Sequence, residues 1–324
     1  MRSNNVLGFI FAATLDDKIP ELASSRTTAS VPIGGKYRII DFDLSNMSNS
    51  GISNVGIVAK SNFQSLMDHV GSGSAYDLSK RRSNLSILPP YDGKAFSSFV
   101  ETIYNMHGYI EHCREEYVLI SQGNVITNID YTDVFDFHSK KKADITLIYK
   151  NHAIPQGYDR PITLDVDNDG KVNQIFVKPG VVDKGVFNHA YGSILIKKDL
   201  LMSEIRNAIS VNQLDVRRLI QSSLGKYSIY AYENKGYCAA ISSINDYFEF
   251  NMDLMKKEVR DELFNPQRPI YTKVRDDAPS RYGLTSNVKN SIIAQGCVIN
   301  GEVETALFQR AFMSAKAQSF LTVL

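Results

Sequence analysis

Short apolar runs of strand length alternate along this chain with segments that have the spacing of helices. The runs occupy residues 6–13, 55–59, 117–121 and 144–149. Between them, residues 99–113 carry apolar side chains mostly three or four positions apart, which predicts an amphipathic helix. Strands that alternate with helices predict crossover connections and a mainly parallel sheet. A ligand of such a sheet binds beyond the carboxyl ends of its strands, which directs attention to the loop after the first run.

A different pattern appears towards the C-terminus. Ile292 and Val298 lie six positions apart, and so do Ile293 and Ile299. A six-residue apolar period is typical of a parallel β-helix, although an ordinary hairpin with glycine turns also fits this spacing. The period fades after Phe308, so only one or two coils are expected.

Length and composition bound the number of domains and the classes of function. With 324 residues and 43% hydrophobic composition, the chain exceeds one compact domain, and we expect domains at residues 1–255 and 256–324. A formal net charge of +1 gives no field that would draw the protein onto nucleic acid, and no apolar stretch is long enough for a membrane span. Cys113, Cys238 and Cys297 fit neither a disulfide framework nor a zinc site, and the start lacks an export signal, so we expect a cytoplasmic protein.

Two polar patterns predict local structure. The sequence DNDG at residues 167–170 favours a hairpin turn, because Asn, Asp and Gly tolerate positive φ. Asp130, Asp133 and Asp136 could form a carboxylate cluster, but their spacing is typical of a helix start, where acids cap the first turn. We therefore expect these three aspartates to be structural.

Residues 34–57, GGKYRIIDFDLSNMSNSGISNVGI, carry the most specific signal. They closely resemble the pattern GGKYRIIDFxLSNxxNSGIxxxGI of the glucose-1-phosphate adenylyltransferases, also called ADP-glucose pyrophosphorylases. The resemblance also covers residues 123–131, 176–180 and 245–254, and it extends through the C-terminal segment to about Phe308.

The resemblance implies a fold and an activity. It implies an α/β fold, with a Rossmann-like nucleotidyltransferase domain of mixed, mainly parallel sheet, followed by a left-handed parallel β-helix that is short and truncated here. Members of the family are tetramers. They make ADP-glucose and pyrophosphate from ATP and glucose 1-phosphate, in the first committed step of bacterial glycogen synthesis.

The phosphate-binding loop of the family is replaced in this chain. The family pattern LAGGxGxRLxPLTxxRAKP uses glycines to bring amide groups near the triphosphate and an arginine to neutralise pyrophosphate. This chain reads FAATLDDKIPELASSRTTAS. The three glycine positions, the arginine position and the lysine position hold, in chain order, Ala13, Thr14, Asp16, Lys18 and Thr28. Side chains and added negative charge therefore oppose ATP binding, although Arg26 is retained.

The metal and sugar positions are also altered. The family holds Mg²⁺ between two aspartates, and these positions align with Asn124 and Ala240. An amide is a poorer magnesium ligand than a carboxylate, and alanine is no ligand. The family's lysine for glucose 1-phosphate aligns with Lys178, whereas its glutamate and serine neighbours align with Val177 and Ala190.

Motifs that define the fold are thus kept while phosphate and metal ligands are lost. This selective pattern predicts a non-catalytic, regulatory-type subunit of the kind found in some Gram-positive bacteria, which packs against a catalytic glucose-1-phosphate adenylyltransferase subunit and shifts its active population. We expect a homo- or hetero-oligomer that needs no cofactor of its own, and we leave open a sugar-phosphate effector. Arg26, Lys36 and Arg38 are candidates for binding an anion or for structural hydrogen bonds.

Two alternatives stay open. The chain could be an active nucleotidyltransferase that binds Mg²⁺ through water and uses Lys18 in place of arginine. Losing several transition-state contacts would then slow it by many powers of ten. The other alternative is an interaction scaffold unrelated to glycogen, because a shortened β-helix changes the surface available for assembly.

Overall fold

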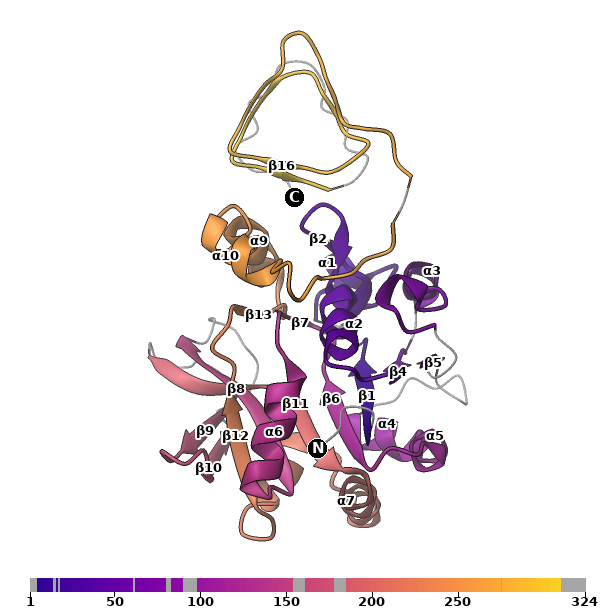
Figure 1. Ribbon diagram of the computed structural model, residues 1–324, viewed down its shortest axis with the longest axis vertical. Coiled ribbons are helices and arrows are strands. Elements are labelled where there is room, and N and C mark those ends of the chain that lie inside the picture. Colours follow the sequence, from indigo (N-terminus) through magenta and orange to yellow (C-terminus); the bar gives the residue numbers. More distant parts are fainter. Residues whose placement is uncertain are drawn as a thin grey trace.

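A nine-stranded mixed sheet forms the centre of the larger domain (Figure 1). The computed structural model describes residues 5–13, 16, 18–60, 62–79, 83–89, 98–153, 161–177, 185–274 and 276–309. Within them the strand order is β10-β9-β11-β6-β1-β4-β5, and β8 pairs with both β11 and β12. The strands are β1 Val6–Phe11, β4 Asn54–Val58, β5 Asn84–Leu88, β6 Tyr117–Ser121, β8 Ile145–Ala153, β9 Ile162–Val166, β10 Val172–Val177, β11 Val186–Lys197 and β12 Ile229–Glu233.

The sheet is parallel around β1 and antiparallel around β11. β1 pairs in parallel with β4 and β6, β4 with β5, and β12 with β8. β11 runs antiparallel to β6, β8 and β9. The four predicted apolar runs correspond to β1, β4, β6 and β8, so the predicted parallel strands are confirmed, and the long strand β11 accounts for the mixed character.

Helices cover both faces of the sheet (Figure 1). They are α1 Pro20–Ala23, α2 Ile39–Asn49, α3 Gln64–Val70, α4 Phe99–Asn105, α5 His107–His112, α6 Tyr131–Lys141, α7 Lys198–Ser210, α8 Val216–Ser222, α9 Ile244–Asp253 and α10 Lys257–Leu263. Because successive residues of a strand point to opposite faces, β1 serves two cores. Leu7 and Phe9 pack with α4, α5 and α7, whereas Val6 and Ile10 pack with α2, α3 and α6.

The single helix predicted for residues 99–113 is two helices. α4 and α5 meet at Met106, whose φ of −93° and ψ of 7° lie outside the helical range. The predicted apolar face is nevertheless confirmed, since Val100, Ile103 and Ile110 all pack into the core on the α7 side of the sheet.

One turn and one helix cap predicted from the sequence are present. Residues 167–170 turn between β9 and β10, which pair antiparallel, and Gly170 has a φ of +84°. Asp130 caps α6 by accepting a hydrogen bond from the backbone N–H of Thr132 at 2.9 Å.

Two further strand pairs lie outside the large sheet, and both are antiparallel. They are β2 Pro32–Ile33 with β3 Tyr37–Arg38, and β7 Val125–Thr127 with β13 Cys238–Ala240.

Beyond α10 the chain winds into a three-sided coil (Figure 1). Its sides are the parallel pairs β14 Arg281–Tyr282 with β17 Val298–Ile299, β15 Asn287–Lys289 with β18 Glu302–Glu304, and β16 Ile292–Ile293 with β19 Leu307–Phe308. Ile292 lies beside Leu307, not beside Val298. The six-residue spacing therefore separates residues on successive sides of the three-sided coil, such as β16 and β17. The hairpin alternative does not describe this segment.

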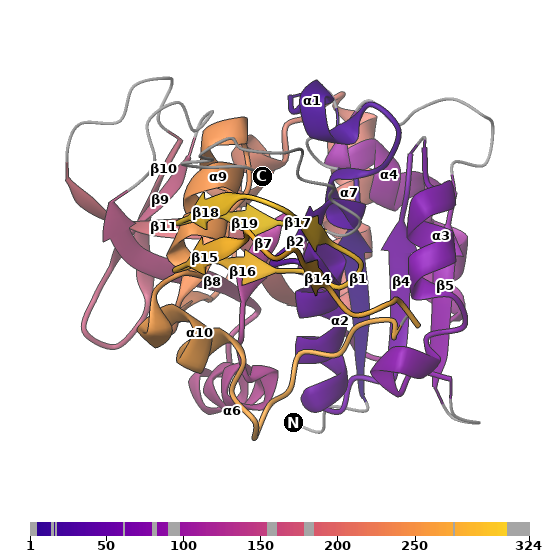
Figure 2. The same ribbon diagram turned by 90° about the horizontal axis from the view of Figure 1, so that it is seen from above.

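The coil is seated on the larger domain, over β2 and α9 (Figures 1 and 2). Leu307, fully buried, belongs to the same apolar cluster as Ile33, Phe42 and Phe250. Gln309 also donates a hydrogen bond to the hydroxyl of Tyr247 at 3.4 Å. None of the helices among the described residues combines the length and the apolar character that a bilayer crossing requires.

Candidate functional site

The loop after β1 is tied to the segment that follows α1. The Oδ1 atom of Asp16 accepts hydrogen bonds from the backbone N–H and from the hydroxyl of Thr28, both at 2.7 Å. The backbone N–H of Ala29 donates to the carbonyl of Ala12 at 3.1 Å. Two of the five altered loop positions are thus brought together. The Asp16 carboxylate, in the loop after β1, already occupies two hydrogen-bond donors of Thr28. We call this arrangement the Asp16–Thr28 contact.

The two altered metal positions lie on neighbouring segments. Ile241 donates its backbone N–H to the carbonyl of Asn124 at 2.9 Å, and Asn124 returns a bond from Nδ2 to the carbonyl of Ile241 at 3.1 Å. Ala240 pairs with Val125 next to them. The buried Oδ1 of Asn124 has no hydrogen-bond partner among the described residues.

These residues do not fit a magnesium ion. Mg²⁺ requires hard oxygen ligands and is usually held by one or two carboxylates. Asn124 offers one neutral amide oxygen, and Ala240 offers a methyl group. Across the described ranges, no group of three or more His, Cys, Asp and Glu side chains is placed to hold a metal ion.

Three stacked or tilted rings surround Ala190, the position aligned with the family's serine. His152, His189 and Tyr191 lie on β8 and β11, with ring centroids 4.5 to 5.5 Å apart. The hydroxyl of Tyr191 is 2.5 Å from Nε2 of His152. Burial lowers the pKa of His189 to about 3, with a smaller contribution from His152, and burial also lowers the pKa of His152. Neutral imidazoles next to Ala190 give little stabilisation to a phosphate anion.

One carboxyl group in this region was missed by the sequence analysis. Asp43, on α2, accepts a hydrogen bond from the hydroxyl of Ser121 at 2.5 Å, at the carboxyl end of β6. Its second oxygen, Oδ2, is buried and has no partner among the described residues. Burial raises the pKa of Asp43 to about 7, and the bond from Ser121 opposes this shift. The available signal was that Asp43 is an acidic residue at the variable position, x, of the family pattern GGKYRIIDFxLSN.

The retained basic residues divide by role. Arg38 is structural, because its Nη1 donates to the carbonyl and to the hydroxyl of Ser65 at 2.6 and 2.8 Å. Lys36 is exposed, and its Nζ lies 4.9 Å from the centroid of the Tyr37 ring. Arg26 is half-buried just after α1, and Lys18 is exposed just before it. The predicted positions Thr14 and Lys178 lie outside the described residues.

The same motif supplies a buried polar network. Oδ1 of Asp41 is bonded by Nε2 of His69 and by the hydroxyl of Tyr76, both at 2.6 Å, and Oδ2 accepts the backbone N–H of Arg38 at 2.8 Å. Asp41 and Tyr76 are fully buried. Burial, together with Asp41, raises the pKa of Tyr76. The retained motif therefore joins α2, α3 and the β2–β3 hairpin, which is a structural role.

Comparison with known proteins adds the wider relationships. The sequence model of the family described as Nucleotidyl transferase matches residues 17–257. The chain is 36% identical over 324 residues to the glycogen biosynthesis protein GlgD of Geobacillus stearothermophilus, covering 97% of this chain and 82% of that protein. It is 30% identical over 315 residues to GlgD of Bacillus subtilis (strain 168), with 96% and 81% covered. The glucose-1-phosphate adenylyltransferase of the same Bacillus strain is 30% identical over 318 residues, with 94% and 81% covered.

Proposed function

The chain belongs to the nucleotidyl transferase family, and from that premise we propose that it is a regulatory, non-catalytic subunit of a glucose-1-phosphate adenylyltransferase in glycogen biosynthesis. The observation that carries the proposal is the Asp16–Thr28 contact. A phosphate group bound after the first strand of such a sheet needs free N–H donors and positive potential. This chain places a carboxylate there instead.

The metal positions support the same proposal. Nucleotidyl transfer from a triphosphate develops negative charge on the leaving pyrophosphate, and a bound cation normally stabilises it. Asn124 and Ala240 are adjacent, yet they supply no carboxylate. Phosphate-stabilising interactions are therefore lost both in the loop after β1 and at the metal positions. Each lost transition-state interaction lowers the rate by roughly 10²–10³.

The relatives support a two-chain enzyme. One Bacillus subtilis strain contains both a protein named GlgD and a protein named glucose-1-phosphate adenylyltransferase, and each is 30% identical to this chain. We infer that this chain likewise forms a hetero-oligomer with a catalytic subunit. It would act by contacting that subunit more favourably in its active state, because only a difference in contact energy shifts the population.

The same premise extends to the architecture. We infer that the three-sided coil winds left-handed and that the domains divide at residue 255.

We also infer that Lys178 is the first residue to test for sugar-phosphate binding. In the alignment, Val177 and Ala190 stand where the family has the glutamate and the serine that accompany this lysine.

Pyrophosphate release from ATP and glucose 1-phosphate tests the proposal. The chain is assayed alone and is then titrated into the catalytic subunit from the same organism. We expect no turnover alone, and in the mixture a higher rate or a changed effector response that saturates at a fixed ratio of the two chains. Size-exclusion chromatography of the mixture should show a species that neither chain forms alone.

Two other outcomes would reject the proposal. Turnover by the isolated chain that is abolished by Lys178→Ala would show an active nucleotidyltransferase. A mixture that behaves as the simple sum of its components, in rate and in size, would show a scaffold outside this pathway. Mg-ATP gives an independent check, since an enzyme that binds it gains thermal stability, and we expect no such gain here.

A further inference from the structure

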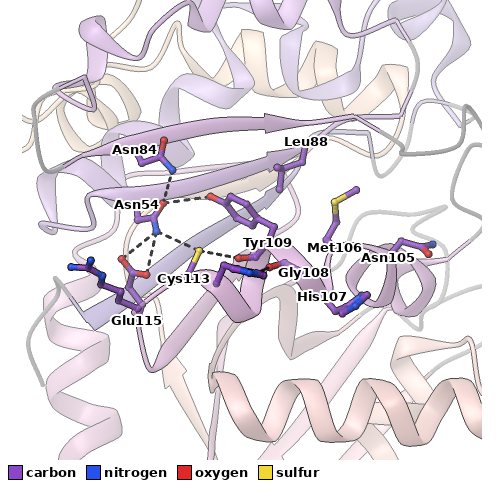
Figure 3. A pocket seen from close by; sticks show the side chains of 12 residues that line it. Asn54, Asn84, Leu88, Asn105, Met106, His107, Gly108, Tyr109, Cys113 and Glu115 are labelled. Atoms are coloured by element: carbon purple, nitrogen blue, oxygen red, sulfur yellow. Dashed lines mark hydrogen bonds between the residues drawn. The ribbon is translucent and has the colours of Figure 1, made fainter.

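A pocket lies away from the altered loop and metal positions, at the edge of the sheet (Figure 3). Its volume is about 860 Å³, and it is lined by residues of β4, β5, α5 and the loop that leads into β6. Asn54 and Asn84 begin β4 and β5, so the polar part of the pocket is at the amino ends of these strands. The Asp16–Thr28 contact lies beyond the opposite, carboxyl end of β1. The pocket is therefore separate from the nucleotidyl transfer site.

The floor of this pocket depends on a glycine. A Cβ atom on Gly56 would lie 3.0 Å from Cε1 of Tyr109 and 3.1 Å from Cδ1 of Leu88, closer than ordinary contact. Its absence lets the Tyr109 ring rest against β4. Leu88 and Tyr109, both partly buried, pack against the main core, to which the buried Met106 belongs. The partly exposed ring of Tyr109 and side chain of Leu88 can contact the apolar face of a ring-shaped ligand.

The polar groups above the floor are only loosely bonded to one another (Figure 3). Nδ2 of Asn54 is 3.2 Å from both carboxylate oxygens of Glu115. Oδ1 of Asn54 receives Nδ2 of Asn84 and the hydroxyl of Tyr109, each at 3.4 Å. Good hydrogen bonds of these types are near 2.8–2.9 Å, so the two bonds to Oδ1 of Asn54 are longer than usual by about half an ångström and the two to Glu115 by about 0.3 Å. A ligand hydroxyl, which both donates and accepts, can make shorter bonds to these groups than they make to one another.

The charge of the pocket excludes a strongly anionic ligand. Arg114 and Glu115 are the charged residues among those that line it, and their charges cancel. Nδ1 of His107 and Nδ1 of His112 each donate to a backbone carbonyl of their own helical segment, at 2.7 and 2.5 Å, so only Nε2 of each ring is left for a ligand. Burial raises the pKa of Tyr109 to about 12, so its hydroxyl also remains protonated. The lining thus offers donors and acceptors from the Asn54 and Asn84 amides, the Tyr109 hydroxyl and the Glu115 carboxylate.

We propose that this pocket binds an uncharged carbohydrate, a short chain of glucose units, through the Asn54, Asn84, Tyr109 and Glu115 side chains. The carboxamides of Asn54 and Asn84 donate to and accept from neighbouring hydroxyls of a sugar, the Glu115 carboxylate accepts from them, and Tyr109 and Leu88 meet its apolar ring face. The choice of glucose units rests on the proposed function in glycogen biosynthesis. The pocket would then report the presence of glucan to the two-chain enzyme.

Isothermal titration calorimetry of the full chain with maltotriose tests this inference. We expect binding with a Kd of roughly 1 mM or tighter, as for an open site with a few hydrogen bonds. Glucose 1-phosphate is the comparison ligand, and it should bind more weakly at this pocket because no net positive charge is available. A silent titration at millimolar maltotriose, or preference for glucose 1-phosphate in competition, would overturn the proposal.

Variants locate the binding site. Tyr109→Phe keeps the ring and removes the hydroxyl, and Asn84→Ala removes an exposed amide; each should weaken maltotriose binding by roughly fivefold to tenfold. Gly56→Ala should abolish binding by displacing the Tyr109 ring. Glu233→Gln, on β12 at the other side of the sheet, is the matched control. Thermal unfolding of every variant shows that the fold is kept, and equal affinities in all of them would place the sugar elsewhere.

The two hypotheses fail separately. Calorimetry uses the isolated chain and does not depend on pyrophosphate release. Stimulation of the catalytic subunit without maltotriose binding would reject the carbohydrate site alone. Maltotriose binding without any effect on the catalytic subunit would reject the regulatory role alone.

Discussion

Asp43 combines a fully buried carboxyl group with an oxygen that has no partner among the described residues. Its pKa is raised from 3.8 to about 7, so the folded state retains a proton that the unfolded state releases. Its stabilising contribution is therefore complete at low pH, falls as the pH rises through this interval, and is absent above it.

Asp43→Asn should remove most of this pH dependence. The amide cannot ionise and still accepts the bond from Ser121, so we expect the free energy of unfolding at pH 8 to rise by about 1–3 kcal/mol. Urea unfolding of both proteins between pH 5 and pH 8 measures the effect. Asp133→Asn, at an exposed carboxyl group of α6, is the control. An unchanged pH slope in Asp43→Asn would show that another group titrates.

Asp16 is a second residue whose role can be isolated. Asp16→Ala breaks both bonds to Thr28, and we expect it to lower the free energy of unfolding by about 1–2 kcal/mol. Thr28→Val removes only the hydroxyl bond and should cost less than Asp16→Ala. Neither variant should release pyrophosphate from ATP, because Asn124 and Ala240 are unchanged. Activity in Asp16→Ala alone would mean that the contact is the sole block to catalysis.

At the scale of elements, the β7–β13 pair sets the geometry of the altered metal positions. Replacing Asn124 and Ala240 together by Asp puts two carboxylates on adjacent segments. We expect only this double variant to be stabilised by Mg²⁺, by about 1.4 kcal/mol at ten times its Kd. Thermal unfolding with and without Mg²⁺ gives the answer, and each single variant is its control. A double variant indifferent to Mg²⁺ would show that the two segments diverge too far to share an ion.

The elements also show what a sequence can reveal. Central strands buried on both faces are continuous apolar runs, so β1, β4, β6 and β8 were predictable. The break at Met106 was not, because Met106 is itself apolar and the helical period continues through it. The direction of β11 was equally hidden, since pairing direction depends on tertiary contacts and not on local pattern.

The candidate site was predictable in part. Alignment with a family pattern located the altered positions, and the structure shows that Asp16 meets Thr28 and that Asn124 neighbours Ala240. The sequence could not show where the oxygens of Asp43 point. Hydrogen-bond partners depend on distant segments, which a single sequence does not bring together.

At the scale of the whole molecule, the coil and the larger domain share one apolar cluster. Leu307 of the coil packs with Ile33 and Phe250 of the larger domain and is fully buried. Leu307→Ala should lower the free energy of unfolding by about 2–4 kcal/mol. It should also leave a single transition, because both parts lose the same core. Ile299→Ala is the matched control, because it truncates a buried side chain inside the coil that is not part of the shared cluster.

Circular dichroism and tyrosine fluorescence, followed in the same urea titration, measure this cooperativity. Coincident curves in Leu307→Ala and in the parent protein are expected. Two separate transitions, with the coil melting first and the larger domain unaffected, would contradict the shared core.

The Asp16–Thr28 contact has a consequence for how such an enzyme is controlled. The Asp16 carboxylate is part of the polypeptide, so its local concentration at Thr28 is the same in a starved cell and in a fed one. Under the proposed function, fluctuating nucleotide levels are read by the catalytic chain alone. With respect to nucleotide supply, what this chain contributes then depends on how many copies are made, and the ratio of the two gene products becomes an adjustable quantity.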